Sequence, residues 1–173
     1  MSLLSRDPLA NVEPLIERVY AYVAYRIGAG ARAEDVTSDV FERALRYRKS
    51  YDASRGTPIA WLLGIARRVL ADEKPFELLD VRDEAAPGDM EMDVVRHLTL
   101  TSALAHLDLR DRDLIALRYG ADLTAKEIAR AHGLRTNTVE VALHRALGRL
   151  RAHLDESAPT EAPLRSALQP VRI

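Results

Sequence analysis

The sequence predicts an all-α protein built from two small helical domains joined by an acidic linker. Apolar residues recur at three- and four-residue steps in several segments, and no segment alternates with period two over a useful length. Proline and acidic residues interrupt the helical pattern near the middle of the chain. We therefore divide the 173 residues into a first helical domain (1–72), an acidic linker (73–93), a second helical domain (94–154) and a mobile, proline-containing tail (155–173).

Three helices are expected in the first domain. Residues 14–27 carry a single apolar stripe, and Gly28 and Gly30 follow where this helix should end. Residues 33–47 form a second helix, and Thr57 followed by Pro58 is a capping residue and a first-turn proline that open a third. The inward positions of the second helix are expected to be Val36, Val40, Phe41, Ala44 and Leu45.

Two features of this domain have simple structural explanations. The second helix carries a mixed-charge band, which is typical of a solvated surface. Trp61 stands in the strongly apolar third helix, where large aromatic side chains serve mainly as buried area.

The second domain is expected to begin with two further helices. Residues 92–107 resume the helical pattern, Asp108 has the chemistry of an N-cap, and residues 110–119 place Leu114, Ile115 and Leu117 inside. Gly120 then ends that helix.

Residues 123–150 have the pattern of two short helices joined by a tight turn. Thr124 and Glu127 have the spacing of a capping box, Gly133 can end the first helix with a positive φ, and Leu134 is expected to fill the corner. Arg135 or Thr136 would cap the second helix, whose apolar positions from 139 to 154 recur at helical steps. A short glycine-containing turn between two helices is how a DNA-binding helix-turn-helix is built, although an ordinary helical hairpin has the same spacing.

The formal net charge of −1 conceals a strong asymmetry along the chain. Counted by segment, the net charge is +2 over residues 1–72, −6 over 73–93, +4 over 94–154 and −1 over 155–173. Because phosphate contacts dominate affinity for DNA, the two mildly basic domains could each meet nucleic acid while the acidic strip avoids it.

Several classes of function lack support in the sequence. The chain has no cysteine, and its five histidines, which we interpret as surface or packing residues, lack the spacing of a metal site. No phosphate loop, nucleophile elbow or recognisable carboxylate pair is present, so we expect no enzyme activity, no catalytic residue, no metal and no cofactor. The N-terminus does not have the pattern of a signal peptide and no run reaches transmembrane length, so we expect a cytoplasmic protein without a membrane partner.

Two stretches together carry a family resemblance. AEDVTSDVFERALRYRKSYDASRGTPIAWLLGIARRVLAD resembles region 2, and LRDRDLIALRYGADLTAKEIARAHGLRTNTVEVALHRALGRLR resembles region 4, of the extracytoplasmic-function (ECF) sigma factors of the sigma-70 family. The resemblance implies a dissociable specificity subunit of bacterial RNA polymerase that binds the core enzyme, recognises the −35 and −10 promoter elements and assists DNA melting. Region 2 would be a three-helix bundle and region 4 a helix-turn-helix bundle.

The resemblance assigns two surfaces to the first domain. The second helix would dock on the clamp of the beta-prime subunit of core polymerase, whose beta subunit is also an expected partner, through Asp35, Ser38, Asp39, Glu42, Arg43 and Arg46. The loop before the third helix, and that helix itself, would contact an unstacked base and the backbone of the −10 element through Tyr51, Ser54, Arg55, Thr57, Ile59, Trp61, Arg67 and Arg68.

The second domain would place the helix from about residue 136 in the major groove of the −35 element. The candidate contacts are Lys126, Arg135, Thr136, Asn137, Thr138, Glu140, Val141, His144, Arg145 and Arg149. The acidic linker would pass through the basic RNA exit path of the polymerase, and an inhibitory anti-sigma factor is a further expected partner.

The chain also departs from the pattern of the family. A Lys or Arg is frequent where this chain has Glu140 and Ala142, and a basic run usually follows the third helix of region 2, where this chain has Asp72 and Glu73. These departures keep a second hypothesis open, a sigma mimic that sequesters an anti-sigma factor without reading DNA. A stand-alone helix-turn-helix regulator would leave the first domain and the acidic strip without a role.

Overall fold

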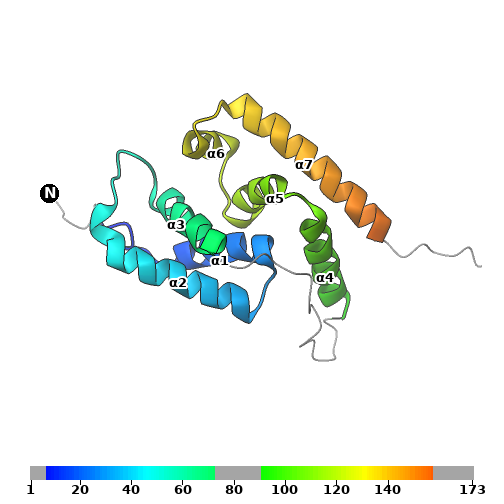
Figure 1. The fold of residues 1–173 in the computed structure, drawn as a ribbon, viewed down its shortest axis with the longest axis horizontal. Helices are drawn as coiled ribbons and strands as arrows, with labels where there is room; N and C mark the ends of the chain where they lie inside the picture. Colours follow the sequence, from blue (N-terminus) through cyan, green and yellow to red (C-terminus); the bar gives the residue numbers. More distant parts are fainter. Residues whose placement is uncertain (1–6, 73–90, 158–173) are drawn as a thin grey trace, which may run out of the picture.

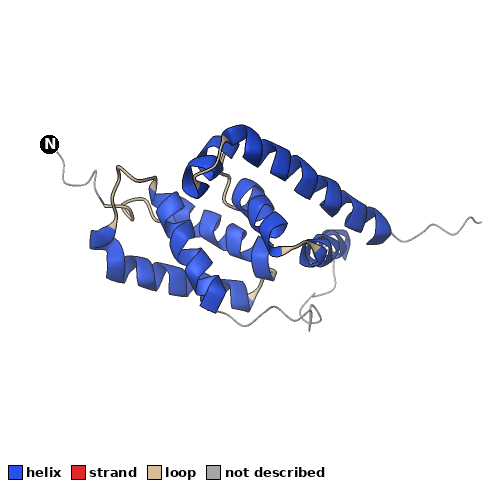
Figure 2. Cartoon of the chain, turned by 45° about the horizontal axis from the view of Figure 1, so that its top comes forward, coloured by secondary structure: helices blue, strands red, loops and turns tan. Residues whose placement is uncertain are grey.

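The protein is all-helical in the computed structural model, which describes residues 7–72 and 91–157 (Figure 1). These residues contain no strand, and every regular element among them is a helix (Figure 2). None of the described helices has the length and apolar character needed to cross a bilayer. The elements are α1 (Glu13–Ile27), α2 (Ala31–Tyr47), the 3-10 turn η2 (Arg48–Ser50), α3 (Pro58–Asp72), α4 (Glu91–His106), α5 (Leu109–Ile115), the π-helical turn η3 (Ala116–Gly120), α6 (Ala125–His132) and α7 (Thr136–Ser157).

The first three helices pack against one another in an N-terminal bundle. Each contributes apolar side chains at helical spacing, and burial of these side chains stabilises the bundle. The predicted stripe of α2 is only partly correct, because Phe41 is half-buried and Leu45 is 62% exposed. The inward face is completed instead by Ala33 and by Thr37, whose hydroxyl donates to the carbonyl of Ala33 at 2.7 Å.

Glycines set the turn between α1 and α2. Gly28 has φ 89° and Gly30 has φ 119°, values that side chains with a Cβ rarely adopt. Because Gly30 stands directly before the helix, α2 begins at Ala31, two residues earlier than the sequence predicts. The turn therefore joins α1 and α2 in three residues.

The helix expected over residues 110–119 is divided in the structure. Asp108 is its N-cap as predicted, since its side chain accepts a hydrogen bond from the backbone N–H of Asp111 at 2.8 Å. After Ile115 the backbone widens into the π-helical turn η3, in which the N–H of Ala121 reaches the carbonyl of Ala116. A π-turn contains one residue more than an α-helical turn, and no side-chain pattern in this segment predicts the extra residue.

The helix-turn-helix forms at the predicted residues. Thr124 and Glu127 make both hydrogen bonds of the capping box, and Gly133 ends α6 with φ 65°. Leu134, expected to fill the corner, is 43% exposed. The corner is instead set by the backbone, because the N–H of Leu134 donates to the carbonyl of Ala129 at 2.9 Å.

One apolar cluster extends across both bundles, and a second, smaller cluster lies within the C-terminal bundle around Leu104, Ile115 and Leu150. In Figure 1, α1 lies at the junction of the bundles, with α2 on one side and α5 on the other. The π-helical turn η3 packs on α1 so closely that a Cβ on Gly120 would lie 2.9 Å from backbone atoms of Ala21 and Tyr22. A single core cluster therefore continues from Val19 through Leu117 to Val139.

Two arginines reinforce this junction through backbone carbonyls. Arg18 on α1 donates to the carbonyls of Ala121 and Asp122, at 2.7 and 3.2 Å. Buried Arg112 donates to carbonyls at the end of α4, including that of Leu104 at 2.8 Å, and to the carbonyl of Arg26 at 3.4 Å. Carbonyls at helix ends lack intrahelical partners, so these guanidiniums satisfy groups that burial would otherwise leave unpaired.

We predict that Thr124→Ala destabilises the protein by about 1 kcal/mol, because it removes the hydroxyl that accepts from the N–H of Glu127. Thermal unfolding should show a fall in Tm of roughly 2–4 °C. Thr124→Ser keeps the hydroxyl and should unfold close to the wild-type temperature; equal losses in the two variants would contradict a capping role.

A pH dependence follows from the same capping box. The N–H and hydroxyl of Thr124 hold the pKa of Glu127 below its ordinary value of 4.5. A depressed folded-state pKa contributes stability that is present above the unfolded pKa and lost as the pH falls through the folded pKa. Thermal melts should therefore show a stability difference between wild type and Glu127→Gln at pH 7 that shrinks below about pH 4.

Candidate nucleic-acid interface

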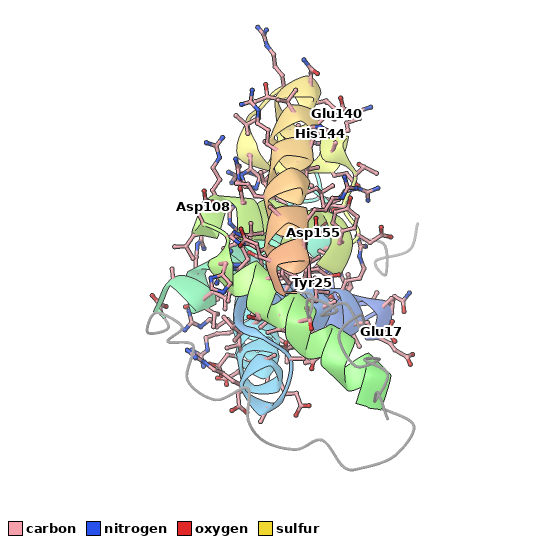
Figure 3. The ribbon with its side chains drawn as sticks, turned by 90° about the vertical axis from the view of Figure 1, so that its right-hand side faces the viewer. Glu17, Tyr25, Asp108, Glu140, His144 and Asp155 are labelled. Atoms are coloured by element: carbon pink, nitrogen blue, oxygen red, sulfur yellow. The ribbon has the colours of Figure 1, made fainter. Side chains whose placement is uncertain are left out.

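The outer face at the start of α7 carries most of the predicted −35 contacts. Val139 and Leu143 point into the core and fix the rotation of the helix, so the intervening polar residues face solvent. Glu140 and His144 lie on the N-terminal half of α7, at the end of the molecule opposite α2 (Figure 3). The predicted −35 contacts Lys126, Arg135, Thr136, Asn137, Thr138, Glu140, Val141, His144 and Arg145 are all exposed.

The positive charges on this face differ in their availability. Within the described part of the chain, Arg135 and Arg145 form no salt bridge, so both guanidiniums are available to a ligand. Arg149 instead pairs with Asp111, a carboxylate that is only 4% exposed. The hydrogen bond to Asp111 raises the pKa of Arg149, and it fastens α7 to α5. Arg149 therefore has a structural partner in addition to its predicted role.

The loop between α2 and α3 is built by local hydrogen bonds. Asp52 accepts from the N–H and the hydroxyl of Ser54, at 2.9 and 2.7 Å, and these bonds lower the pKa of the Asp52 carboxyl. The hydroxyl of Tyr51 donates to the carbonyl of Gly56 at 2.9 Å. This network holds Ser54 and Arg55 outward, where both are exposed.

The aromatic residues of this loop form a pair. The rings of Tyr51 and Trp61 have centroids 5.5 Å apart with a tilt of 60°, and both side chains are half-buried. Exposed Thr57 accepts weakly from the N–H of Ala60 at 3.4 Å. Ile59, which was expected to contact the −10 element, is 4% exposed and packs in the core. In this conformation Ile59 packs under the α2–α3 loop, on the core side.

Arg67 and Arg68 have different surroundings although they are neighbours in sequence. Both are exposed, but Arg67 also reaches across to the C-terminal bundle and pairs with Asp113 at 3.1 Å. A guanidinium nitrogen of Arg67 also lies 3.3 Å from Nε2 of His132. Two effects lower the pKa of His132: its burial, which is the larger, and the positive charge of Arg67.

Sequence reasoning did not find the partners of Arg67. Asp113 also binds the hydroxyl of Tyr22 at 2.6 Å and pairs with Arg26. The run RDRD at 110–113 looks in sequence like a solvated helical turn, yet tertiary contacts bury its last three residues. Asp111 pairs with Arg149 of α7, Arg112 donates to carbonyls at the end of α4, and Asp113 contacts α1. No short-range pattern distinguishes such charges from surface ones.

The predicted polymerase-binding face of α2 is exposed along one side of the helix. Asp35, Ser38 and Asp39 face solvent. Glu42 pairs with Arg46 at 2.7 Å and half-buried Arg43 pairs with Asp72 at 3.3 Å. Such surface pairs contribute only about 0.3–1 kcal/mol, so a partner can rearrange them at little cost.

A cavity of about 660 Å³ lies beside the junction of the two bundles. Its wall includes cationic groups of Arg26, Arg67 and Arg110 and apolar side chains of Leu70, Leu109 and Leu134. Among the described residues, no three His, Asp or Glu side chains come together in a way that could hold a metal ion.

Comparison with known proteins agrees with this geometry. Residues 12–74 match the family model for sigma-70 region 2, and residues 97–150 match that for sigma-70 region 4. The chain is 32% identical over 162 residues to the ECF RNA polymerase sigma factor SigD of Mycobacterium tuberculosis, with 84% of this chain and 74% of the relative covered. It is 30% identical over 153 residues to the ECF RNA polymerase sigma factor BldN of Streptomyces coelicolor, of which it spans 58%, with 82% of this chain covered.

Two solved structures share the fold. One is CnrH in complex with the cytosolic domain of CnrY, with a TM-score of 0.59, 24% identity and coverage of 84% of this chain and 82% of that one. The other is the sigma factor RpoE in complex with the anti-sigma factor NepR from Bartonella quintana, with a TM-score of 0.61, 17% identity and coverage of 83% and 93%. With helical domains that match regions 2 and 4 in order, the chain belongs to the ECF RNA polymerase sigma factors.

Proposed function

We propose that this chain is a cytoplasmic sigma factor that binds core RNA polymerase, recognises the −35 and −10 promoter elements and assists DNA melting. The observation that carries the proposal is the α7 face, where a capped helix-turn-helix presents an exposed polar first turn with unpaired Arg135 and Arg145. The chain supplies binding and positioning and has no catalytic step of its own.

The α7 face has the chemistry to distinguish bases in a major groove. Arginine binds guanine O6 and N7, asparagine binds adenine, and an apolar group contacts the methyl of thymine. Arg145, Asn137 and Val141 offer these three kinds of contact. Glu140 repels phosphate, so its productive role is to accept from a cytosine amino group.

The α2–α3 loop has the chemistry to hold a single strand. Unpaired bases bind through stacking on aromatic rings and through cations along the backbone. Tyr51 and Trp61 supply the rings, and Arg55 and Arg68 supply exposed charge. Binding energy for unpaired bases offsets part of the few kcal/mol that unstacking a base costs, so melting requires no hydrolysis by this chain.

The exposed side of α2 is the proposed docking surface for the beta-prime clamp of core polymerase, and the beta subunit is a further proposed contact. Its mixture of carboxylates and guanidiniums favours a partner of complementary charge pattern. The proposed acidic linker falls mainly on residues 73–90, outside the described residues, so its path is argued from charge alone.

An anti-sigma factor is the second proposed protein partner. The two solved neighbours that share this fold are each described in complex with another protein, the cytosolic domain of CnrY in one case and the anti-sigma factor NepR in the other. Sequestration of the free factor by such a partner would keep its DNA-binding faces from promoters.

The deciding experiment is in vitro transcription with core polymerase, the full-length protein and a promoter from its own genomic neighbourhood. Specific initiation that depends on the protein is the expected result. Binding to polymerase without specific initiation would contradict the proposal.

A sigma mimic that only titrates an anti-sigma factor is the alternative. Arg67 and Arg149 favour it, because both are engaged by carboxylates within the protein rather than held free for DNA. Tight binding of an anti-sigma factor with no promoter binding in the polymerase complex would select this alternative.

We predict that Asp39→Lys weakens binding to core polymerase by roughly tenfold, because it reverses a charge in the centre of the docking face. Glu17→Lys makes the same charge reversal at an exposed position of α1, outside that face, and this variant should bind core polymerase like wild type. Fluorescence anisotropy of the labelled factor titrated with core enzyme measures both; equal affinities for the two variants would show that α2 is not the docking helix.

We predict that Arg145→Ala lowers promoter binding of the polymerase complex by roughly 1–3 kcal/mol while leaving binding to core enzyme unchanged. Arg151→Ala removes the same charge further along α7 and is the matched control. Parallel measurements of transcription and core binding test this, and a loss of both activities by Arg145→Ala would mean that the face is misassigned.

A further inference from the structure

The cavity beside the junction of the two bundles has room for a small molecule. Its volume of about 660 Å³ falls within the range of roughly 300–1,000 Å³ that is usual for ligand pockets in proteins. Residues of α1, α3, α5, α6 and α7 form its wall, and no residue of α2 contributes to the described part of that wall. The cavity is therefore a candidate binding site separate from the proposed polymerase-binding face.

Much of the cavity wall is aliphatic. Of the fifteen described residues that line it, eight are Ala, Val, Leu or Ile and none is Phe, Tyr or Trp. Leu109 and Leu134 are among them and are 70% and 43% exposed, so an occupant that covers them is stabilised by burial of apolar surface. Bases are commonly held by stacking on aromatic side chains, so this wall favours an occupant with an aliphatic body.

The polar part of the wall is cationic. Four guanidiniums line the cavity, those of Arg26, Arg67, Arg110 and Arg112, and Asp113 is the only acidic residue among the described residues that do so. Four positive charges less one negative charge leave a formal charge of +3, with histidine counted as neutral. Arg110 forms no salt bridge within the described part of the chain. Because a cleft lined by charge of one sign attracts the opposite sign, this wall favours an anion.

Two groups in the wall are affected by this positive potential. Burial is the larger cause of the lowered pKa of Arg112, and the positive charge of Arg26 adds to it. In the same way, burial and then the positive charge of Arg67 lower the pKa of His132. The wall thus disfavours further positive charge, and an anion in the cavity would relieve that repulsion.

We propose that this cavity binds a small amphipathic anion, an alkyl chain that carries a carboxylate or phosphate head group. The head group lies against the guanidiniums, because arginine can form two parallel hydrogen bonds with either kind of anion. The alkyl chain lies along the aliphatic part of the wall, where it covers Leu109 and Leu134. A fatty acid and an alkyl phosphate both have this chemistry.

Isothermal titration calorimetry of the free full-length protein measures this binding independently of any activity in transcription. Decanoate and decyl phosphate, each below its micelle concentration, are the probes, and the tighter of the two identifies the preferred head group. That probe should bind one molecule per chain. Decanol has the same alkyl chain without a charge and should bind at least about tenfold more weakly, because hydrogen bonds to a charged group are lost. Decyltrimethylammonium, which has the opposite charge, and inorganic phosphate, which has no chain, should both bind more weakly still.

Arg110→Gln tests the contact with the head group. It removes an exposed cation of the cavity wall, so it should weaken binding of the anionic probe by about tenfold and leave decanol binding nearly unchanged. Arg151→Gln is the matched control, since it removes the same charge from an exposed position of α7 that does not line the cavity. Equal losses in the two variants would assign the effect to overall charge and would overturn the site.

Ala142→Leu tests the aliphatic part of the wall. Ala142 is half-buried on α7 and lines the cavity, so the added carbons occupy space that the alkyl chain needs. This variant should weaken binding of the anionic probe by about tenfold or more, whereas Ala152→Leu, at an exposed position of α7 outside the cavity, should bind it like wild type. Circular dichroism checks that each variant keeps its helices, and an unfolded Ala142→Leu would leave the ligand series and Arg110→Gln to decide.

The binding outcomes are distinct from those of the transcription experiment. Selective binding of an anionic probe that Arg110→Gln weakens and Arg151→Gln does not supports the site, even if the protein fails to initiate transcription. Equal affinities for the anionic probes, decanol and decyltrimethylammonium would show non-specific association of the alkyl chain and would overturn it. No binding of either anionic probe at millimolar concentration would also overturn it and would leave the cavity to a protein partner.

Discussion

The close packing of η3 on α1 is the constraint on which the rest of the structure depends. Gly120 allows the two backbones to approach within a distance that excludes any side chain between them. This approach places Asp113 among donors of the N-terminal bundle and lets one apolar cluster extend across both bundles. That contact, together with the hydrogen bonds to Asp113 and from Arg18, sets the relative position of the α2–α3 loop and the helix-turn-helix.

The polar and apolar parts of the junction have different energetic roles. Apolar burial along α1 favours closure without specifying orientation, because it is non-directional. The hydrogen bonds to Asp113 and the bonds from Arg18 to backbone carbonyls are directional and select one arrangement. Charges buried in this way contribute modest net stability, since desolvation offsets much of their attraction. Such an interface can be specific and still open when a larger partner competes for its surfaces.

Local sequence patterns predict the individual helices and their caps, but they do not predict how the helices pack together. The Thr124–Glu127 capping box, the Asp108 cap and the glycine at 133 all form as predicted, because each depends on residues within one turn. The π-turn at η3, the exposure of Leu45 and Leu134, and the burial of Asp111 and Asp113 were not predicted. The burial of Asp113 depends on residues about ninety positions away, such as Tyr22, and that of Asp111 on Arg149 of α7, so a single sequence has no short-range pattern for either. The exposed reading face of α7 could be inferred, whereas the engagement of Arg67 could not.

The distance between the two bundles can be measured directly by energy transfer between dyes on cysteines introduced at exposed Glu17 of α1 and exposed Ala152 of α7, in the free protein and in its complex with core polymerase and promoter DNA. We expect one short distance in the free protein and a distance longer by tens of ångströms in the promoter complex, because about 25 base pairs, or roughly 85 Å of duplex, separate the −35 and −10 elements. An unchanged distance in a transcriptionally active complex would contradict this expectation, since the two surfaces would then read DNA while docked together.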